Sequence, residues 1–173
     1  FDIIISCGRK SVVPSIYLKK YSKKKIINIH IQNPRVSLQN FDYIISPEHD
    51  NLHGPNVITS KGAIHYLTLN EINESKNYLE TKIEKGKDII TLILGGPTRY
   101  YDYNSENMIQ IFSKINKHLI YNNLQLIVIP SNRTPKEIVT FAKEYFSKNR
   151  LIIETVDKKA YLSSLALSKY LVV

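Results

Sequence analysis

The segment DIITLILGGP, residues 88–97, decides how the rest of the sequence is interpreted. Residues 88–94 form a short apolar run rich in β-branched side chains, which is typical of a strand buried on both faces of a parallel sheet. Two glycines and a proline follow directly, as expected for the loop that leaves such a strand. This strand and its loop therefore indicate that a second α/β block begins about halfway along the 173 residues.

The alternation of strand, loop and helix continues on both sides of this segment, which favours parallel βαβ units. On the amino-terminal side we expect strands over 1–6, 25–32, 41–46 and 56–59, and a helix over 11–21 with Ser11 as its N-cap. On the carboxyl-terminal side we expect helices over 104–121, 134–148 and 158–167, and strands over 124–129, 151–154 and 170–173. A further helix over 70–85 would end at Gly86.

We therefore predict an α/β fold with two Rossmann-like domains, 1–68 and 87–173, joined by an interdomain helix or linker at 69–86. A single continuous sheet is the alternative. Because residues 1–6 already have strand character and residues 170–173 are apolar, we expect a piece of a longer protein in which both domains are incomplete.

The composition excludes several classes of protein. Hydrophobic residues make up 43% of the chain, which is enough for a folded core and excludes a disordered chain. No apolar run reaches the roughly 18–20 residues of a membrane span. One cysteine excludes a disulfide framework, and the histidines lack a metal-ligand spacing, so no metal site is expected.

The formal charge of +9 comes from 24 Lys and Arg against 15 Asp and Glu. The densest positive run, Lys19–Lys25, is not interleaved with aromatic residues in a stacking pattern, so we expect no nucleic-acid partner. A solvated helix end is the simplest interpretation of this run, and an anionic membrane surface is the alternative.

Ligands of open parallel sheets bind beyond the carboxyl ends of the strands. Four of the five arginines lie in the loops expected there: Arg9, Arg35, Arg99 and Arg133. Arginine suits bidentate binding of phosphate or carboxylate, so an anionic ligand is predicted at these edges, with solvated loop arginines as the alternative.

The loops themselves carry further candidates. Gly95 and Gly96 would let a ligand approach the backbone, although a structural turn is the simpler interpretation of the pair alone. Thr134 fits the N-cap of the next helix, which would place Ser131 and Arg133 directly before a helix start that favours phosphate.

Four other residues carry separate expectations. His49 and Asp50, beside Glu48, offer a general base for an attacking hydroxyl. His30, flanked by isoleucines, is expected to be a packed, hydrogen-bonded side chain. Cys7 lacks a nucleophile-elbow sequence and is expected to be a buried thiol.

Six segments together resemble a known family, the Elm-type mitochondrial fission family. They are SCGRKSVVPSIYLKK (6–20), HIQNPRV (30–36), FDYIISPEHD (41–50), GPNVITSKGAIH (54–65), LILGGPTRYY (92–101) and PSNRTP (130–135). The family is similar to glycosyltransferases of the GT-B type, in which two Rossmann-like domains flank a cleft. Asn132 departs from the family, which usually has an arginine there, and family chains continue into a Ser-rich acidic motif beyond the last strand.

The resemblance implies roles for particular residues. The carboxyl-terminal domain would bind the nucleotide-sugar donor through Gly95, Gly96, Arg99, Ser131, Arg133 and Thr134. The amino-terminal domain would bind the acceptor through Gly8, Arg9, Gln32, Pro34 and Arg35, with His49 and Asp50 as catalytic candidates.

The expected function is therefore a glycosyltransferase-like protein that binds a nucleotide-sugar in that cleft as substrate, without a metal or other cofactor. A cytoplasmic location is expected, with a peripheral position at a membrane as the alternative. Two other functions stay open: a non-catalytic mitochondrial-fission-type interaction protein at a membrane surface, and a nucleotide-sugar enzyme such as an epimerase.

Overall fold

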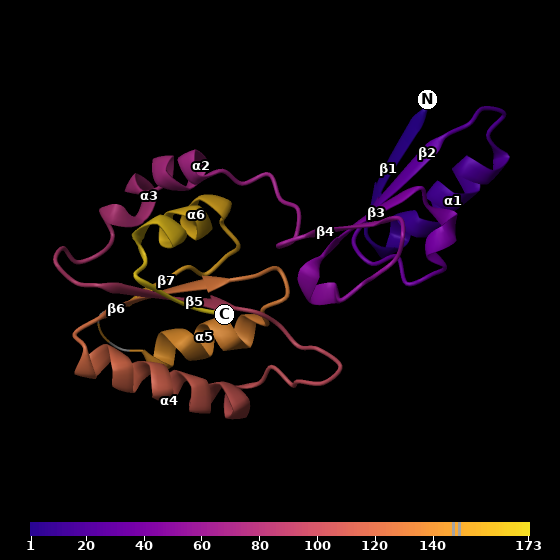
Figure 1. Ribbon diagram of the computed structural model, residues 1–173. Helices are drawn as coiled ribbons and strands as arrows, with labels where there is room; N and C mark the ends of the chain where they lie inside the picture. The colour runs from indigo at the N-terminus through magenta and orange to yellow at the C-terminus, as the bar shows by residue number, and fades with distance from the viewer. Residues whose placement is uncertain (147, 149) are drawn as a thin grey trace. The chain divides into compact units, whose positions relative to one another are not determined.

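Apolar strands and the helices between them sort the chain into two α/β units (Figure 1). The computed structural model describes residues 1–146, 148 and 150–173. Unit 1 comprises Phe1–Tyr66 and unit 2 comprises Leu67–Val173. Each unit contains one parallel sheet of four strands, so the predicted α/β fold with two Rossmann-like blocks is confirmed.

Unit 1 is a sheet whose strands follow one another in chain order, β1-β2-β3-β4. The strands are β1 (Ile3–Cys7), β2 (Ile27–Ile31), β3 (Tyr43–Pro47) and β4 (Val57–Ser60). The helix α1 (Val12–Tyr21) connects β1 to β2, and the 3-10 helices η1 (Arg9–Ser11), η2 (Leu38–Asn40) and η3 (Glu48–Asp50) lie in the loops. Because all neighbours pair in parallel, the four strands end at one edge of the sheet.

The covered face of this sheet buries polar side chains, and its exposed face carries isoleucines. Ile44 packs with Val12 of α1 and with Phe41, so the face that carries Ile44 is the covered one. Asn28 and His30 are fully buried, and His30 lies in register with Ile44. The opposite face carries Ile3 and Ile5 of β1 with Ile27, Ile29 and Ile31 of β2, and Ile5 there is 68% exposed.

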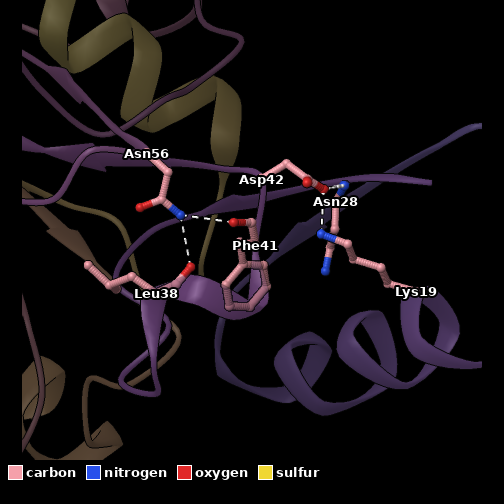
Figure 2. Close-up of polar contacts among 6 residues, drawn as sticks. All are labelled: Lys19, Asn28, Leu38, Phe41, Asp42 and Asn56. Carbon is pink, nitrogen blue, oxygen red and sulfur yellow. Dashed lines mark hydrogen bonds and ion pairs between the residues drawn. The ribbon is translucent and has the colours of Figure 1, made fainter. Parts of the chain in front are cut away.

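Two polar side chains hold the loop before β3 in place (Figure 2). The Asn56 amide donates to the carbonyl oxygens of Leu38 and Phe41 at 2.8 and 2.9 Å. The Asp42 carboxylate accepts from the backbone N–H of Asn28 and from the Lys19 ammonium, each at 2.7 Å. Asp42 thereby ties α1 and β2 to the start of β3.

Unit 2 has the strand order β7-β6-β5-β8, all parallel. The strands are β5 (Ile89–Leu94), β6 (Gln125–Pro130), β7 (Arg150–Ile152) and β8 (Tyr170–Val172). The helices are α2 (Leu69–Glu74), α3 (Asn77–Glu80), α4 (Ser105–Tyr121), α5 (Lys136–Tyr145) and α6 (Lys158–Leu167). The chain runs outward from β5 to β7 and returns to pair β8 on the other side of β5, which makes a topological switch point there.

Helices cover both faces of the second sheet (Figure 1). On one face, α4 and α5 pack on Ile90, Leu92 and Leu94 of β5 through a core that contains Phe112. On the other face, α3 and α6 pack on Ile89 of β5 and on Ile127 and Ile129 of β6. The alternation of side chains along β5 thus serves two cores, as the continuous apolar run predicts.

The segment 69–86 departs from the predicted junction helix. It forms two short helices, α2 and α3, that belong to unit 2. The Ser75 hydroxyl donates to the Glu71 carbonyl oxygen at 2.8 Å, and the Leu79 backbone N–H donates to the Ser163 hydroxyl of α6 at 3.1 Å. Tertiary bonds to α6 therefore replace those of a continuous helix, and Gly86 lies in a later turn with φ of 83°.

Two predicted caps also differ. Ser11 is the N-cap residue of α1, as predicted, but its hydroxyl donates to the carbonyl oxygens of Cys7 and Gly8 at 2.8 and 2.9 Å and makes no cap bond to the helix. The helix predicted over 134–148 begins at Lys136 and ends at Tyr145, and Ser147 lies outside the described residues. Pro135, rather than Thr134, is the N-cap residue of α5.

Candidate functional site

The strand ends of unit 1 enclose a pocket of about 570 Å³. It is lined by Cys7, Arg9, Ile31, Gln32, Asn33, Arg35, Ile45, Pro47, His49, Asp50, Ser60, Ala63 and Ile64. All of these residues belong to unit 1, and five of them are acceptor-side or catalytic candidates from the sequence. The structure therefore brings Arg9, Gln32, Arg35, His49 and Asp50 to one concave site.

Uncommon backbone conformations shape this pocket. Gly8 has a φ of 77°, and its N–H donates to the Ile31 carbonyl oxygen at 3.4 Å. Gln32 and Arg35 adopt positive φ angles of 84° and 57°, which residues with a Cβ rarely do. The Gln32 N–H donates to the Ile45 carbonyl oxygen at 2.8 Å, and the Arg35 N–H donates to Asn33 Oδ1 at 2.9 Å. These bonds hold the loop after β2 in a turn that places both side chains on the pocket.

The catalytic candidates lie together on η3. His49 Nε2 is 3.9 Å from Asp50 Oδ1, and the other Asp50 oxygen accepts a hydrogen bond from the Ser46 hydroxyl at 3.3 Å. The His49 side chain is 68% exposed, so its imidazole is free to meet a ligand in the pocket. The pair can accept a proton from a hydroxyl group, with Ser46 orienting the carboxylate.

The expectation for Cys7 is wrong. Its thiol is exposed and lines the pocket, because strand alternation puts Cys7 on the same face as the exposed Ile5. By contrast, the prediction for His30 is confirmed: it is fully buried, its Nδ1 is 2.8 Å from the Ser6 hydroxyl, and burial lowers its pKa.

The donor-side candidates of unit 2 meet where β5 and β6 end. The Thr134 hydroxyl lies 2.8 Å from the Leu94 carbonyl oxygen and 2.7 Å from that of Gly95, to which it can donate. It also accepts from the Ser131 N–H at 2.8 Å. Thr134 thus joins the two exit loops, which is a different role from the predicted helix cap.

Gly96 and Gly95 have separate explanations. A Cβ at Gly96 would lie 2.2 Å from the Arg133 carbonyl oxygen, so this glycine is required by the close approach of the two loops. A Cβ at Gly95 would meet only Tyr103 Cε2, at 4.0 Å, which is an ordinary contact. The structural interpretation of the glycine pair therefore holds for Gly96, whereas Gly95 has room beside it.

Arg99 lies in a tight turn that the sequence did not reveal. Thr98 and Tyr101 form an isolated antiparallel bridge, and the Arg99 guanidinium lies over the Tyr100 ring, 4.7 Å from its centroid. Tyr103 anchors the turn, because its hydroxyl accepts from the Gly95 N–H at 3.0 Å. Burial raises the pKa of Tyr103, although the hydrogen bond from Gly95 opposes this. The run of tyrosines was the available signal for this aromatic loop.

The arginines of both sites are without acidic partners among the described residues. The ion pairs found there involve lysines or His49, and none includes Arg9, Arg35, Arg99 or Arg133. Within the same residues, no group of histidine, cysteine or carboxylate side chains could hold a metal ion. None of the helices described is both long and apolar enough to cross a membrane.

The two parallel four-stranded sheets with their helices make a fold of the GT-B structural type. The chain superimposes on a UDP-GlcNAc 2-epimerase from Methanocaldococcus jannaschii with a TM-score of 0.64, over 98% of this chain and 55% of that one. The identity is 16%, so this likeness concerns the fold. The whole chain, residues 1–173, matches the family described as Mitochondrial fission ELM1, and the chain belongs to that family.

Two relatives extend the comparison. An uncharacterized protein of Rickettsia prowazekii (strain Madrid E) is 27% identical over 208 residues, which covers 99% of this chain and 58% of the relative. The mitochondrial fission protein ELM1 of Arabidopsis thaliana is 33% identical over 48 residues, which covers 28% of this chain and 11% of the plant protein. The chain thus spans less than two thirds of the length of either relative.

Proposed function

We propose that this chain binds a nucleotide-sugar and acts in a glycosyltransferase-like reaction. The observation that carries the proposal is the joined pair of exit loops in unit 2. Gly96 and Thr134 hold Ser131 and Arg133 against the end of β5, the strand beside the topological switch point. Anionic ligands of such sheets bind at this edge.

The donor would be bound by the residues of these loops. Arg133 and Arg99 have no acidic partner among the described residues, so both are available to neutralise a diphosphate. Ser131 adds a hydroxyl beside Arg133, whose N–H donates to it at 3.3 Å. The exposed Tyr100 ring offers a surface on which a planar base or a sugar face could pack.

The reaction would use the pocket of unit 1 for the acceptor. The acceptor hydroxyl gives its proton to His49 or Asp50, and its oxygen forms the new bond to the anomeric carbon. The bond from that carbon to the donor's phosphate oxygen breaks, and the nucleotide leaves with the electron pair, as a diphosphate from UDP-, GDP- or ADP-sugars and as a monophosphate from CMP-sugars. Arginines near the leaving diphosphate would stabilise its growing negative charge without a metal ion.

Calorimetry with UDP-, GDP-, ADP- and CMP-sugars tests donor binding. We expect one class of nucleotide to bind, and Arg133→Ala to weaken it about tenfold, as the loss of one charged hydrogen bond predicts. Lys114→Ala, which removes one positive charge from the exposed surface of α4, is the matched control and should bind as the wild type does. No heat with any of the four classes would refute the proposal.

Product analysis separates transfer from epimerisation. Incubation of the bound nucleotide-sugar with and without candidate acceptors should yield a glycosylated product only when an acceptor is present. A change in the configuration of the sugar without acceptor would instead favour the epimerase alternative, the activity named for the structural neighbour.

A second candidate function, docking on an anionic membrane, is favoured by the outer surface of α1. Val13, Tyr17, Leu18 and Tyr21 are exposed there, between 47% and 72% of their area, beside the exposed lysines 20 and 23–25. Exposed aromatic and aliphatic side chains next to lysines are typical of surfaces that lie on anionic lipid. Lys19 is not part of this surface, since it pairs with Asp42.

Vesicle co-sedimentation tests this second candidate. With phosphatidylserine vesicles, changing lysines 23, 24 and 25 to Gln should weaken binding roughly 100-fold, if each lysine contributes ~1 kcal/mol. The same changes at the exposed lysines 61, 114 and 117 form the charge-matched control and should have little effect. Equal loss in both variants, or no wild-type binding, would refute membrane docking.

A further inference from the structure

Two arginines line the pocket of unit 1. Arg9 and Arg35 come from the loops after two neighbouring strands, β1 and β2, and both line the pocket. Among the charged side chains that line it, Asp50 is the only carboxylate, and that group already accepts from Ser46. Neither arginine has an acidic partner among the described residues. Two unpaired guanidinium groups therefore face a ligand in one concavity.

The backbone conformation at Arg35 is unusual and is fixed by neighbouring residues. Arg35 holds a positive φ of 57°, although a left-handed conformation is unfavourable for a residue with a long side chain. The bond from its N–H to Asn33 Oδ1 fixes this turn. Pro34, directly before Arg35, is buried, and its ring restricts the backbone conformations that the loop can adopt. The backbone at Arg35 is therefore fixed where the residue lines the pocket.

We infer that the acceptor bound in this pocket carries a phosphate or carboxylate group, which Arg9 and Arg35 recognise. The role of this ligand as the acceptor rests on the proposed function, whereas the binding of an anion in the pocket does not. Guanidinium groups bind both kinds of oxyanion through paired hydrogen bonds. A volume of about 570 Å³ suits a small molecule such as a sugar phosphate or a sugar acid. The anion would lie on the arginines and a hydroxyl of the same molecule would reach His49 or Asp50.

Cys7 provides a direct readout of occupancy, because it is the chain's single cysteine and it lines this pocket. The rate of Cys7 alkylation by uncharged iodoacetamide is measured on the 173-residue chain with glucose 6-phosphate, glucuronate or glucose at matched ionic strength. A ligand that covers the thiol should slow alkylation about tenfold at ten times its Kd, by mass action. We expect protection by one or both anions and none by glucose, and the two anions separate phosphate from carboxylate recognition.

Variants of the two arginines make the test specific. Arg9→Gln and Arg35→Asn should each weaken protection about tenfold, the loss expected for one charged contact. Asparagine is chosen at position 35 because it tolerates a positive φ. Lys10→Gln is the control, since Lys10 adjoins Arg9 and lies outside the pocket lining. Thermal melting confirms that each variant is folded.

Calorimetry with the same three compounds gives a second readout that does not depend on thiol reactivity. The inference is overturned if neither anion binds, if glucose binds equally well, or if both arginine variants bind as the wild type does. Nucleotide-sugar binding without anion binding would refute this inference alone. Anion binding without any nucleotide-sugar binding would retain the anion pocket and refute the proposed function.

Discussion

Gly96 shows how one missing side chain sets the geometry of the donor-side loops. Its backbone is not in the left-handed region, so the reason for glycine is the Arg133 backbone, 2.2 Å from where a Cβ would stand. Main-chain atoms cannot move aside as a flexible side chain can. The approach of the loops after β5 and β6 therefore depends on this position.

Gly96→Ala should lower the free energy of unfolding by about 1–3 kcal/mol, the usual cost of overpacking. It should also weaken nucleotide-sugar binding, because the Arg133 loop must move away. Chemical denaturation checks the first effect and calorimetry the second. Gly62→Ala is the control, since a Cβ there meets nothing within 4 Å. Equal stability of the two variants would show that the loops have room that the structure does not reveal.

His30 links the stability of unit 1 to pH. Burial lowers its pKa from the ordinary value of 6.5, so the folded state binds fewer protons than the unfolded state. The stability that this provides is fully present above pH 6.5 and is lost as the pH falls below that value, until the folded-state pKa is reached. Unit 1 should therefore become less stable between neutral and mildly acidic pH.

A His30→Asn variant tests this dependence, because asparagine is polar and does not titrate. Denaturation followed from pH 7.5 to pH 5 should show a smaller fall in stability for the variant than for the wild type. His53→Asn, at an exposed histidine, is the control and should keep the wild-type slope. Parallel slopes for the wild type and His30→Asn would assign the acid sensitivity to other groups.

At the scale of elements, the loop before β3 depends on one amide. The Asn56 side chain donates to the carbonyl oxygens of Leu38, the first residue of η2, and of Phe41, which directly follows η2 (Figure 2). This places Phe41 in the small core beside Ile44. A segment with little regular structure is thereby fixed to the sheet.

Asn56→Ala should lower the free energy of unfolding of unit 1 by about 1–3 kcal/mol, because two partly buried carbonyl groups lose their donor. Gln39→Ala is the matched control: Gln39 is exposed on the same 3-10 helix, and its loss should be nearly neutral. Hydrogen exchange of the 37–42 segment should rise only in the first variant. Similar exchange in both variants would contradict the role given to Asn56.

Most elements could be predicted from sequence because local patterns specify them. The run before Gly95 identified β5, and the helix expected over 158–167 is observed with the same bounds. The junction helix over 70–85 was wrong because Ser163, distant in sequence, takes the backbone N–H of Leu79. No local pattern can report a partner on another helix.

The candidate site likewise has features that the sequence predicts and features that depend on tertiary contacts. Arg9 and Arg35 were identified from their positions after strands, a rule of parallel sheets. The exposure of Cys7 was missed because it depends on which face of the sheet α1 covers. The loop-joining role of Thr134 was missed because a helix cap is the commoner use of a threonine before proline.

At the scale of the whole molecule, each unit has its own sheet and its own core. The core of unit 1 is small, formed by Val12, Phe41 and Ile44, with polar side chains buried around it. The core of unit 2 contains a cluster of aromatic rings in which Phe112 lies 5.0 Å from Phe146 between ring centroids. The two units should therefore differ in stability.

Phe112→Ala should destabilise unit 2 by about 3–5 kcal/mol, the cost of a cavity in a packed core. Hydrogen exchange measured by mass spectrometry should accelerate in α4, α5 and β5 and stay unchanged in the peptides of unit 1. Ile120→Ala, at a residue of α4 that is 76% exposed, is the control. Faster exchange throughout both units would mean that they unfold together.

The exposed isoleucine face of the first sheet has a consequence for how molecules of this chain behave toward each other in solution. Apolar attraction between two copies of the chain is expected at this face, which exposes Ile3, Ile5, Ile27 and Ile58. The formal charge of +9 opposes this attraction by electrostatic repulsion between the copies. Added salt screens the electrostatic repulsion but does not weaken the apolar attraction. Self-association of the chain should therefore increase as the ionic strength rises. Static light scattering should show a second virial coefficient that falls from positive toward negative between 20 mM and 500 mM NaCl, and Ile5→Lys should reduce that fall. A coefficient that rises with salt would mean that this face does not govern self-association.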